Sequence, residues 1–443
     1  MSTILIENGY LLTLDPQDRR FYGDLLIEDS AIRQVGGRIA APADRVIDAR
    51  GLLVLPGFVQ SHVHLCQTLF RCQADDMGLL QWLDTITGLE ARHTPETLYA
   101  SARLGLAELI KSGATALVDM GTLHHQDSVF QAILESGLRG QSGKAMMDLT
   151  ENLPPALRET TAESINESMD LLHRWHGRAG GRIRYGFAPR WQLWNTEGLL
   201  VEIKQEADRS GVCVHGHAGE IYDEVPKMLR ERGWRNLKYL ERIGLVGPNV
   251  QMAHCIWLDD DEIAVLAETG THAMHCPCCN LKLGSGIARV PEMLARGVNV
   301  GLGSDGAPSN NNLDMFIEMR VASLIHKYRL GAEALPALSV LRMATQGGAR
   351  LLGLGDQLGS LEPGKKADLI LLDLGGLQSA PLVDPARDDP VKRIVSACQS
   401  ACVQTSIVDG QVVMENRVLL TMDEAQVIAD ARRAWQQIST QAG

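Results

Sequence analysis

The chain has 443 residues, roughly three times the length of a typical ~150-residue domain, although closed α/β barrels commonly exceed about 200 residues. Its composition, 45% hydrophobic and 22% charged, is that of a globular protein and excludes disordered, collagen-like and coiled-coil classes. The 42 Lys and Arg against 54 Asp and Glu give a net charge of −12, and the sequence has no basic block. We therefore expect no nucleic-acid partner.

Nothing in the sequence indicates a membrane or secretion segment. No apolar run approaches the roughly 18–20 residues of a membrane span, and Met1–Asn8 lacks a basic segment followed by an apolar stretch. The nine cysteines are odd in number and lie mostly inside apolar runs, which is typical of reduced, buried thiols rather than of a disulfide framework. We therefore expect a cytoplasmic protein with no membrane contact.

Both ends of the chain are predicted to be rich in short strands. Turn residues separate short apolar runs through the first 50 residues, and the same pattern recurs between Ala367 and Glu415. A final helix is expected near Met422–Ile438. Because chain termini are commonly close together, we predict one small composite β-sandwich domain made of residues 1–51 and 362–443.

The middle of the chain, residues 52–361, alternates strand-like and helix-like segments. Helical periodicity fills most of the intervals, for example Pro95–Lys111, which Thr94 opens as N-cap. Eight strands alternating with helices predict an α/β fold, a parallel (β/α)8 barrel of the TIM type. An open doubly wound sheet is the alternative, but no Gly-x-Gly-x-x-Gly opens a helix after the first strand. The candidate strands are Leu52–His64, Ala114–Met120, Gly137–Met147, Arg182–Pro189, Val212–Ala218, Val250–Ile256, Thr271–Cys276 and Val298–Asp305.

Side chains that bind metals lie at the C-terminal ends of these strands, where barrels of this type have their active sites. His62 and His64 are two residues apart and therefore point to the same face of the first strand. An incidental pair at a solvated strand end explains His-x-His equally well by itself. With His217 and Asp305 at other strand ends, a metal site of three histidines and one carboxylate, with a position left for water, is the better explanation. His215 shares the face of His217 and is the alternative ligand from that strand.

Several longer motifs, spread over most of the chain, lie at or near these strand ends. They are Pro56–His64 (PGFVQSHVH), His217–Glu220 (HAGE), Ala253–Cys255 (AHC), His275–Gly286 (HCPCCNLKLGSG), Gly303–Asn312 (GSDGAPSNNN) and Gly359–Asp368 (GSLEPGKKAD). Together they resemble the amidohydrolase superfamily. The branch they resemble holds the adenosine-type deaminases (5′-deoxyadenosine, methylthioadenosine and S-adenosylhomocysteine deaminases) and the chlorotriazine hydrolases.

The resemblance implies a metal-dependent deaminase with one divalent metal, Zn²⁺ in the first place and Fe²⁺ as the alternative. The ligands that it implies are His62, His64, His217 and Asp305, and the catalytic groups are Glu220, His254 and Asp305. Glu220 is expected to carry protons, and His254 to polarise the attacking water. The spacing to Glu220 favours His217 over His215 as the ligand. Relatives with two metals bridge them by a lysine on strand four, and Arg182–Pro189 contains none, so one metal is expected.

The segment Cys276-Pro-Cys-Cys279 allows two further interpretations. Its Cys-x-x-Cys spacing suggests a redox pair, or a zinc site of the cytidine-deaminase type. No thioredoxin-like βαβ pattern surrounds it, and His217-Ala-Gly-Glu220 has the wrong spacing for that zinc site. Relatives usually have small hydroxyl residues at Cys278 and Cys279, and we interpret both as packing residues near the pocket.

Five positions bear on the substrate. Glu90 falls where adenosine-deaminating relatives keep a glutamate that accepts ribose hydroxyls, whereas triazine hydrolases tend to have glutamine. Trp82 is expected to flank the pocket, with a core aromatic as the alternative. Arg190 stands where methylthioadenosine and S-adenosylhomocysteine deaminases commonly have histidine, which leaves the 5′ group open. Lys144 and Arg158 lie roughly where basic residues meet the substrate's amino-acid carboxylate in such relatives, with ordinary surface residues as the alternative.

The leading hypothesis is a hydrolytic deaminase that removes the exocyclic amine of an adenine nucleoside and releases ammonia. The alternative is a hydrolase of another aminated or halogenated heteroaromatic ring, such as a triazine or guanine. The missing strand-four lysine disfavours a dihydropyrimidinase-like amide hydrolase, and a non-enzymatic metal-binding module requires Glu220 or His254 to be dispensable. The expected partner is a small-molecule substrate, and a homo-oligomer is expected from the resemblance alone.

Overall fold

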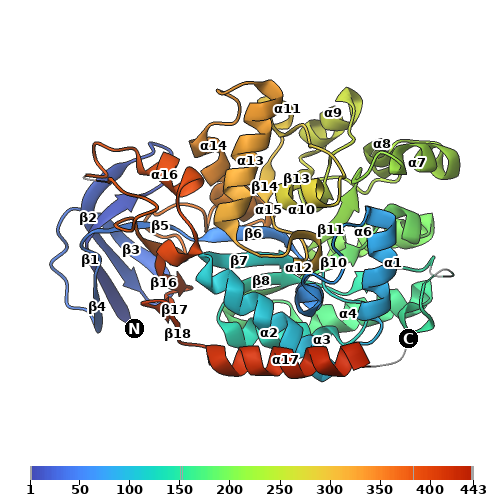
Figure 1. Ribbon diagram of the computed structural model, residues 1–443, viewed down its shortest axis with the longest axis horizontal. Helices are drawn as coiled ribbons and strands as arrows, with labels where there is room; N and C mark the ends of the chain where they lie inside the picture. Colours follow the sequence, from blue (N-terminus) through green and yellow to red (C-terminus); the bar gives the residue numbers. More distant parts are fainter. Residues whose placement is uncertain (1, 150, 152, 383, 441–443) are drawn as a thin grey trace.

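The fold has two parts, a parallel barrel and a separate mixed sheet at one side of it (Figure 1). The computed structural model describes residues 2–149, 151, 153–382 and 384–440. The barrel strands are β6 (Phe58–Val63), β7 (Ala114–Asp119), β8 (Arg139–Ser142), β10 (Ile183–Pro189), β11 (Cys213–Ala218), β12 (Val250–His254), β13 (His272–His275) and β14 (Val300–Leu302). Each strand pairs in parallel with the next, and β9 (Ala145–Met146) pairs with β10. A hydrogen bond from Asp305 N to His62 O, 2.9 Å long, links the first and last strands, so the barrel is nearly closed.

Helices connect the strands and cover the outside of the barrel (Figure 1). The helix α2 (Pro95–Lys111) begins as its sequence predicts, because Thr94 accepts a hydrogen bond from the Thr97 amide and proline occupies the first turn. Other longer helices are α1 (Leu79–Glu90), α3 (Gln126–Ser136), α4 (Thr161–Trp175), α6 (Glu197–Ser210), α7 (Glu224–Arg232), α9 (Asp260–Thr269) and α13 (Met315–Leu330). Shorter ones are α5 (Arg178–Gly181), α8 (Asn236–Arg242), α10 (Pro277–Lys282), α11 (Val290–Ala295), α12 (Ala307–Asn310), α14 (Ala337–Arg342) and α15 (Gly348–Leu351).

The second sheet is built from strands at both ends of the chain. Its strands are β1 (Thr3–Leu12), β2 (Arg20–Glu28), β3 (Ala31–Gly36), β4 (Arg45–Asp48), β5 (Leu52–Pro56), β15 (Leu369–Asp373), β16 (Val403–Val408), β17 (Gln411–Glu415) and β18 (Val418–Leu419). The order is β18-β17-β16-β15-β5-β1-β2-β3, with β4 beside β1, and α16 (Pro390–Ser396) precedes β16. The predicted fold class, an α/β barrel with a separate sheet from the two chain ends, is confirmed.

Two predicted strands are each two strands in the structure. The run Leu52–His64 divides at Gly57 into β5, which pairs with β1 and β15 in the terminal sheet, and β6, which belongs to the barrel. A Cβ atom at Gly57 would lie 2.1 Å from Thr115 Oγ1, so only glycine lets the chain cross at this point. The run Gly137–Met147 divides similarly at Gly143, where a Cβ atom would lie 1.8 Å from Gly186 O. Periodicity alone does not reveal such close backbone approaches.

The last helix, α17 (Glu424–Thr440), leaves the terminal sheet and runs along α2 on the barrel (Figure 1). Its buried side chains Ala434 and Ile438 belong to the same apolar cluster as Trp82 and Cys279. The C-terminal segment, from β15 to α17, therefore contributes to both parts of the fold. The division into a composite domain, 1–51 with 362–443, and a barrel domain, 52–361, stays a proposal.

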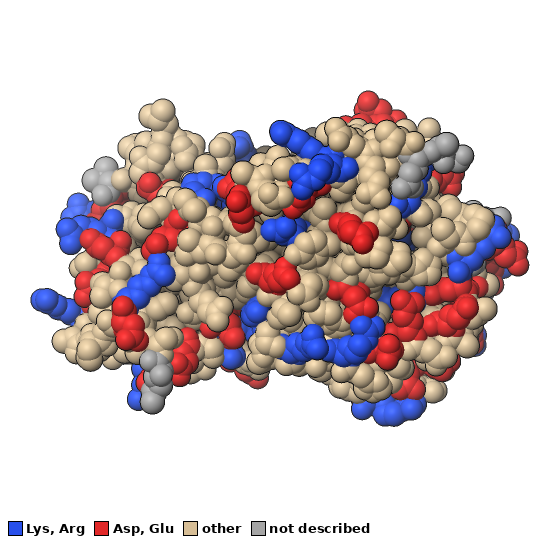
Figure 2. Space-filling model, turned by 90° about the horizontal axis from the view of Figure 1, so that it is seen from below, with Lys and Arg blue, Asp and Glu red and all other residues tan. Residues whose placement is uncertain are grey.

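The surface carries charges of both signs, which lie interspersed on the face seen in Figure 2. Within the described residues, no helix combines the length and the apolarity needed to cross a membrane.

A buried ion pair joins the barrel to the terminal sheet. Arg139 of β8 donates from Nε and Nη2 to the two carboxylate oxygens of Asp368, both at 3.0 Å, and Nη2 also contacts Asp409 Oδ1 at 3.0 Å. The side chains of Arg139 and Asp368 are each only 3% exposed. Since Asp368 lies immediately before β15, this bidentate contact fixes the terminal sheet against the end of a barrel strand.

We expect Arg139→Ala to lower the free energy of unfolding by about 3–5 kcal/mol, because it leaves a buried carboxylate unpaired. Denaturant-induced unfolding checks this. The control is Arg45→Ala, which removes a half-exposed pair with Glu415 and costs about 0–1 kcal/mol. Equal losses for the two variants would contradict a special role for the buried pair.

Candidate active site

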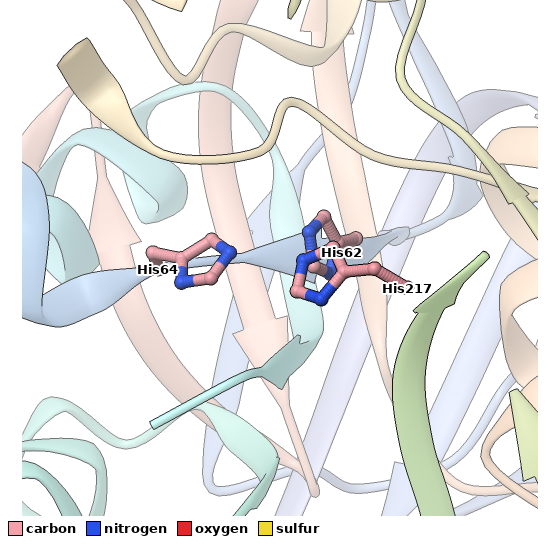
Figure 3. Close-up of side chains that lie close together, drawn as sticks. All are labelled: His62, His64 and His217. Carbon is pink, nitrogen blue, oxygen red and sulfur yellow. The ribbon is translucent and has the colours of Figure 1, made fainter. Parts of the chain in front are cut away.

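Three histidines from two barrel strands face one another at the C-terminal end of the barrel (Figure 3). His62 lies in β6, His64 directly follows that strand, and His217 lies in β11. One ring nitrogen of each lies within 4.8 Å of a ring nitrogen of each of the others. The ring centroid of His62 is 5.0 Å from that of His64 and 4.9 Å from that of His217. The structure thus brings together the three histidines that the sequence places at strand ends.

The hydrogen bonds of these rings are those of metal ligands. His217 donates from Nδ1 to the carbonyl oxygen of Arg190, which leaves Nε2 unprotonated in the neutral ring. Among the described residues, His62 Nε2 and His64 Nδ1 are buried without a hydrogen-bond partner. Desolvation lowers the pKa of His62, His64 and His217, so the rings are neutral, the form that binds metals. Buried nitrogens without partners are costly, and a divalent cation satisfies them.

Asp305 completes this metal site from the opposite side of the barrel seam. Its Oδ1 lies 3.3 Å from Nε2 of His62 and 3.3 Å from Nε2 of His64. The residue has φ of 65°, a strained value for a residue other than glycine and one that is common at functional sites. His254 also belongs here, since one nitrogen of it lies within 4.8 Å of ligand atoms of His62 and Asp305. The four proposed ligands, His62, His64, His217 and Asp305, and the adjoining His254 make up the metal site.

Glu220 and His254 form a pair beside the metal site. His254 donates from Nδ1 to Asn280 Oδ1 at 2.9 Å, and its Nε2 lies 3.7 Å from Glu220 Oε1. The Glu220 amide donates to Glu224 Oε2 at 2.9 Å, which fixes the turn after β11. Burial raises the pKa of Glu220 to about 7. A carboxyl group with this pKa both accepts and gives up protons near neutral pH.

Three residues that support the ligands were not assigned these roles from the sequence. His215 Nε2 lies 2.8 Å from His62 Nδ1, so it stands behind a ligand. Asn280 orients His254, and the Cys279 thiol donates to Asp305 Oδ2 at 2.8 Å. Both Cys279 and Asn280 lie on α10, about one helical turn beyond His275 at the end of β13. The motif His275–Gly286 contained them, but without a spacing that reveals these contacts.

A cavity opens onto the metal site and has aromatic and apolar walls. Its lining residues are His64, Gln67, Leu79, Trp82, Leu83, Arg190, Trp191, Trp194, His217, Glu220, His254 and Asp305. Trp82 is 4% exposed and donates from Nε1 to the carbonyl oxygen of Pro308 at 3.3 Å, which holds its ring in the wall. The tryptophan and leucine side chains suit a flat apolar ring, and the lining also includes metal-site residues and Glu220.

Glu90 and Arg190 form a buried ion pair next to this cavity. Arg190 donates from Nη1 to Glu90 Oε2 at 2.6 Å and from Nη2 to Glu90 Oε1 at 3.0 Å. Gln67 donates from Nε2 to the same Oε1 at 2.7 Å. Because Arg190 is charged and close, the pKa of Glu90 is lowered in spite of the opposing effect of its burial. The two residues were predicted separately from the sequence, and their pairing was not.

The structure places the other two predicted basic residues away from the cavity lining. The Lys144 ammonium is fully buried, 2.6 Å from Glu159 Oε2, 3.3 Å from Glu167 Oε2, and donates to the Leu123 carbonyl. Arg158 is exposed and donates to the carbonyl oxygens of two neighbouring loop residues. Lys144 and Arg158 are therefore both bound to neighbouring protein groups, and neither lines the cavity.

Comparisons with known proteins agree with this site. The profile of the Amidohydrolase family matches residues 53–413. The chain is 39% identical, over 100% of both chains, to 5′-deoxyadenosine deaminase of Methanosarcina acetivorans. It is 39% identical to 5-methylthioadenosine/S-adenosylhomocysteine deaminase of Pelotomaculum thermopropionicum, over 98% of each. A solved structure of a zinc-bound adenosine deaminase from Xanthomonas campestris superposes with a TM-score of 0.92 at 31% identity, over 99% of each chain.

A barrel with histidine and aspartate ligands at its strand ends defines a metal-dependent hydrolase. With the match over most of its length, the chain belongs to the amidohydrolase family, and the resemblance inferred from its motifs is confirmed. The predicted class of enzyme, a metal-dependent deaminase of that family, is confirmed with it.

We expect His62→Ala and Asp305→Ala to reduce the bound metal per chain by at least about tenfold, because each removes a ligand atom. Elemental analysis of the purified proteins measures this. The control is His272→Gln at the opposite end of β13, where His272 Nε2 contacts the Pro248 carbonyl. A control that lost metal equally, or ligand variants that kept it, would contradict the assignment.

Proposed function

We propose that the protein is a hydrolytic deaminase that removes the exocyclic amine of an adenine nucleoside and releases ammonia. The candidate substrates are 5′-deoxyadenosine, methylthioadenosine, S-adenosylhomocysteine and adenosine. One observation supports this most strongly: a largely buried carboxyl group, Glu220, lies beside the metal site and lines a cavity with aromatic walls. The full-length identity to relatives named as deaminases of such nucleosides agrees with it.

One divalent metal is proposed, Zn²⁺ in the first place and Fe²⁺ as the alternative. The ligands are His62, His64, His217 and Asp305. When bound, the metal supplies a Lewis acid that lowers the pKa of water toward neutrality. A single metal is expected because strand β10, Ile183–Pro189, has no lysine to bridge a pair.

Glu220 and His254 are the proton-handling groups. Glu220 takes a proton from the attacking water and passes it to a ring nitrogen of the base, which makes the amine-bearing carbon electrophilic. The water oxygen bonds to that carbon, and the carbon–nitrogen bond then breaks. Glu220 takes the second proton, from the new hydroxyl group, and gives it to the amine, so the nitrogen leaves as ammonia and the oxygen remains as the ring carbonyl. His254, held by Asn280 at Nδ1, keeps its Nε2 on the side of Glu220 and orients the water.

The ion pair beside the cavity limits how Glu90 can bind a ribose. A carboxylate offers about four acceptor positions. Arg190 uses two of them and Gln67 a third, which leaves one position, on Oε2. We therefore propose that Glu90 accepts one ribose hydroxyl and that the Arg190 guanidinium donates to the sugar beside it, while Trp82 flanks the base.

The surroundings of Lys144 and Arg158 bear on the 5′ group. In relatives that use S-adenosylhomocysteine, basic residues near these positions are expected to meet an amino-acid carboxylate, but here Lys144 is committed to Glu159 in the interior. A substrate with a small 5′ group has no amino-acid carboxylate and therefore needs no contact with either residue. We propose 5′-deoxyadenosine, methylthioadenosine and adenosine ahead of S-adenosylhomocysteine for this reason.

We expect Glu220→Gln to keep its metal but to lower kcat by at least about 100-fold, because an amide cannot carry the proton. Ammonia release and metal content, measured on the same preparation, test this. A variant that kept a nearly normal kcat would refute the assigned role. The control is Glu224→Gln, one turn further along and hydrogen-bonded to Trp191 and to the Glu220 amide, for which a much smaller loss is expected.

The alternative function is hydrolysis of another aminated or halogenated ring. The observation that favours it is the Glu90–Arg190 ion pair, because Arg190 already uses acceptor positions of the Glu90 carboxylate that ribose hydroxyls would need. The two functions are separated by comparing adenosine derivatives, free adenine, a triazine and guanine.

If Glu90 meets the ribose, Glu90→Ala lowers kcat/KM for nucleosides by about 10- to 150-fold, the effect of one lost charge-assisted hydrogen bond. Activity on free adenine should change much less. Glu90→Gln, which keeps an acceptor oxygen, should lie between wild type and Glu90→Ala. Equal losses on adenine and on nucleosides would show that Glu90 acts only through the structure, and would move the alternative ahead.

A further inference from the structure

A second group of donor atoms lies beside the proposed catalytic metal site. It consists of a carboxylate oxygen of Glu220, a nitrogen of His254 and the sulfur of Cys279, and these three atoms all lie within 4.8 Å of one another. Because Asn280 occupies Nδ1 of His254, the nitrogen available is Nε2, which lies 3.7 Å from Glu220 Oε1. None of the four proposed ligands of the catalytic metal belongs to this group.

The chemistry of these atoms suits a divalent cation of intermediate softness. Zinc binds imidazole, carboxylate and thiolate at about 2.0–2.3 Å, so tetrahedral ligand atoms lie about 3.3–3.7 Å apart. The separation between Glu220 and His254 already equals the upper value, and Cys279 needs a shift of at most about 1 Å to join them. A carboxylate and a thiolate also neutralise the two positive charges, which matters this close to another cation.

The environment of Cys279 makes this a weaker site than the first. The thiol is fully buried and donates to Asp305 Oδ2 at 2.8 Å. On coordination it releases its proton to solvent and gives up that hydrogen bond, whereas His62 Nε2 and His64 Nδ1 in the first site have no hydrogen bond to give up. Binding at the second site therefore carries a cost that binding at the first does not.

We propose that Glu220, His254 and Cys279 form a second, inhibitory metal site that takes Zn²⁺ or Cd²⁺ when either is in excess. A cation at this second site coordinates the carboxylate that carries protons and the imidazole that orients water, so neither group is free for catalysis. Binding at this site is independent of which ring the enzyme hydrolyses. Only the inhibition rests on the proposed function.

The test uses the zinc-loaded enzyme, freed of excess metal, and Cd²⁺ as the probe. Cys72 is the exposed thiol among the described cysteines, so all proteins carry Cys72→Ser to remove surface binding. We expect one Cd²⁺ per chain to bind while the zinc content stays constant, with a thiolate-to-cadmium absorption band in the ultraviolet. Ammonia release falls in proportion to the Cd²⁺ bound.

The deciding comparison is Cys279→Ser against Cys278→Ser. Cys278 is the next residue back, is partly exposed and faces Glu318, so its loss leaves the three donor atoms in place. We expect Cys279→Ser to lose the band and to weaken Cd²⁺ binding by at least about tenfold, because serine is a poor ligand for a soft metal. Cys278→Ser should keep both the band and the affinity.

Glu220→Gln gives an independent reading if Cys279→Ser does not fold. It keeps the thiol, so the band should persist, but at Cd²⁺ concentrations at least about tenfold higher. The proposal is overturned if no band accompanies the bound Cd²⁺, if Cys279→Ser keeps the band, or if Cys278→Ser loses it. A protein that binds Cd²⁺ as described but deaminates no nucleoside would refute the proposed function and leave this site standing.

Discussion

The site depends on keeping several imidazole rings uncharged inside the barrel. Desolvation lowers the pKa of His62, His64, His215 and His217, and burial of their charged forms would be prohibitive. Neutral rings do not repel one another, and each keeps one nitrogen lone pair. The surrounding strands determine where those lone pairs point. A cation bound among them would replace the water that the rings lost on folding.

The strands hold these rings through contacts of the backbone as well as of the side chains. The amide of Asp305 bonds to the carbonyl of His62 across the seam of the barrel, so two ligands from its first and last strands are joined directly. Arg190 has two connections: its carbonyl accepts from His217, and its guanidinium holds Glu90. One residue therefore connects a metal-site histidine to the carboxylate at which a sugar is proposed to bind.

Much of this arrangement follows from the sequence because parallel strands end at one rim. His62, His217 and Asp305 are far apart along the chain, yet each lies within two residues of the end of a predicted strand, which is sufficient to bring them together. The crossing at Gly57 was not predicted, because an uninterrupted apolar run does not show which of two sheets each half joins. The pairing of Glu90 with Arg190 and the burial of Lys144 depend on side-chain directions that strand and helix patterns leave undetermined.

The docking of α17 on the barrel has a consequence for the order in which the molecule is completed during synthesis. Ile438 shares an apolar cluster with Trp82, a residue of the cavity wall, although the two lie near opposite ends of the chain. Asp305, the final metal ligand, leaves the ribosome long before Ile438 does. A nascent chain can therefore bring its metal-site residues together before the wall that Trp82 forms gains the support of α17.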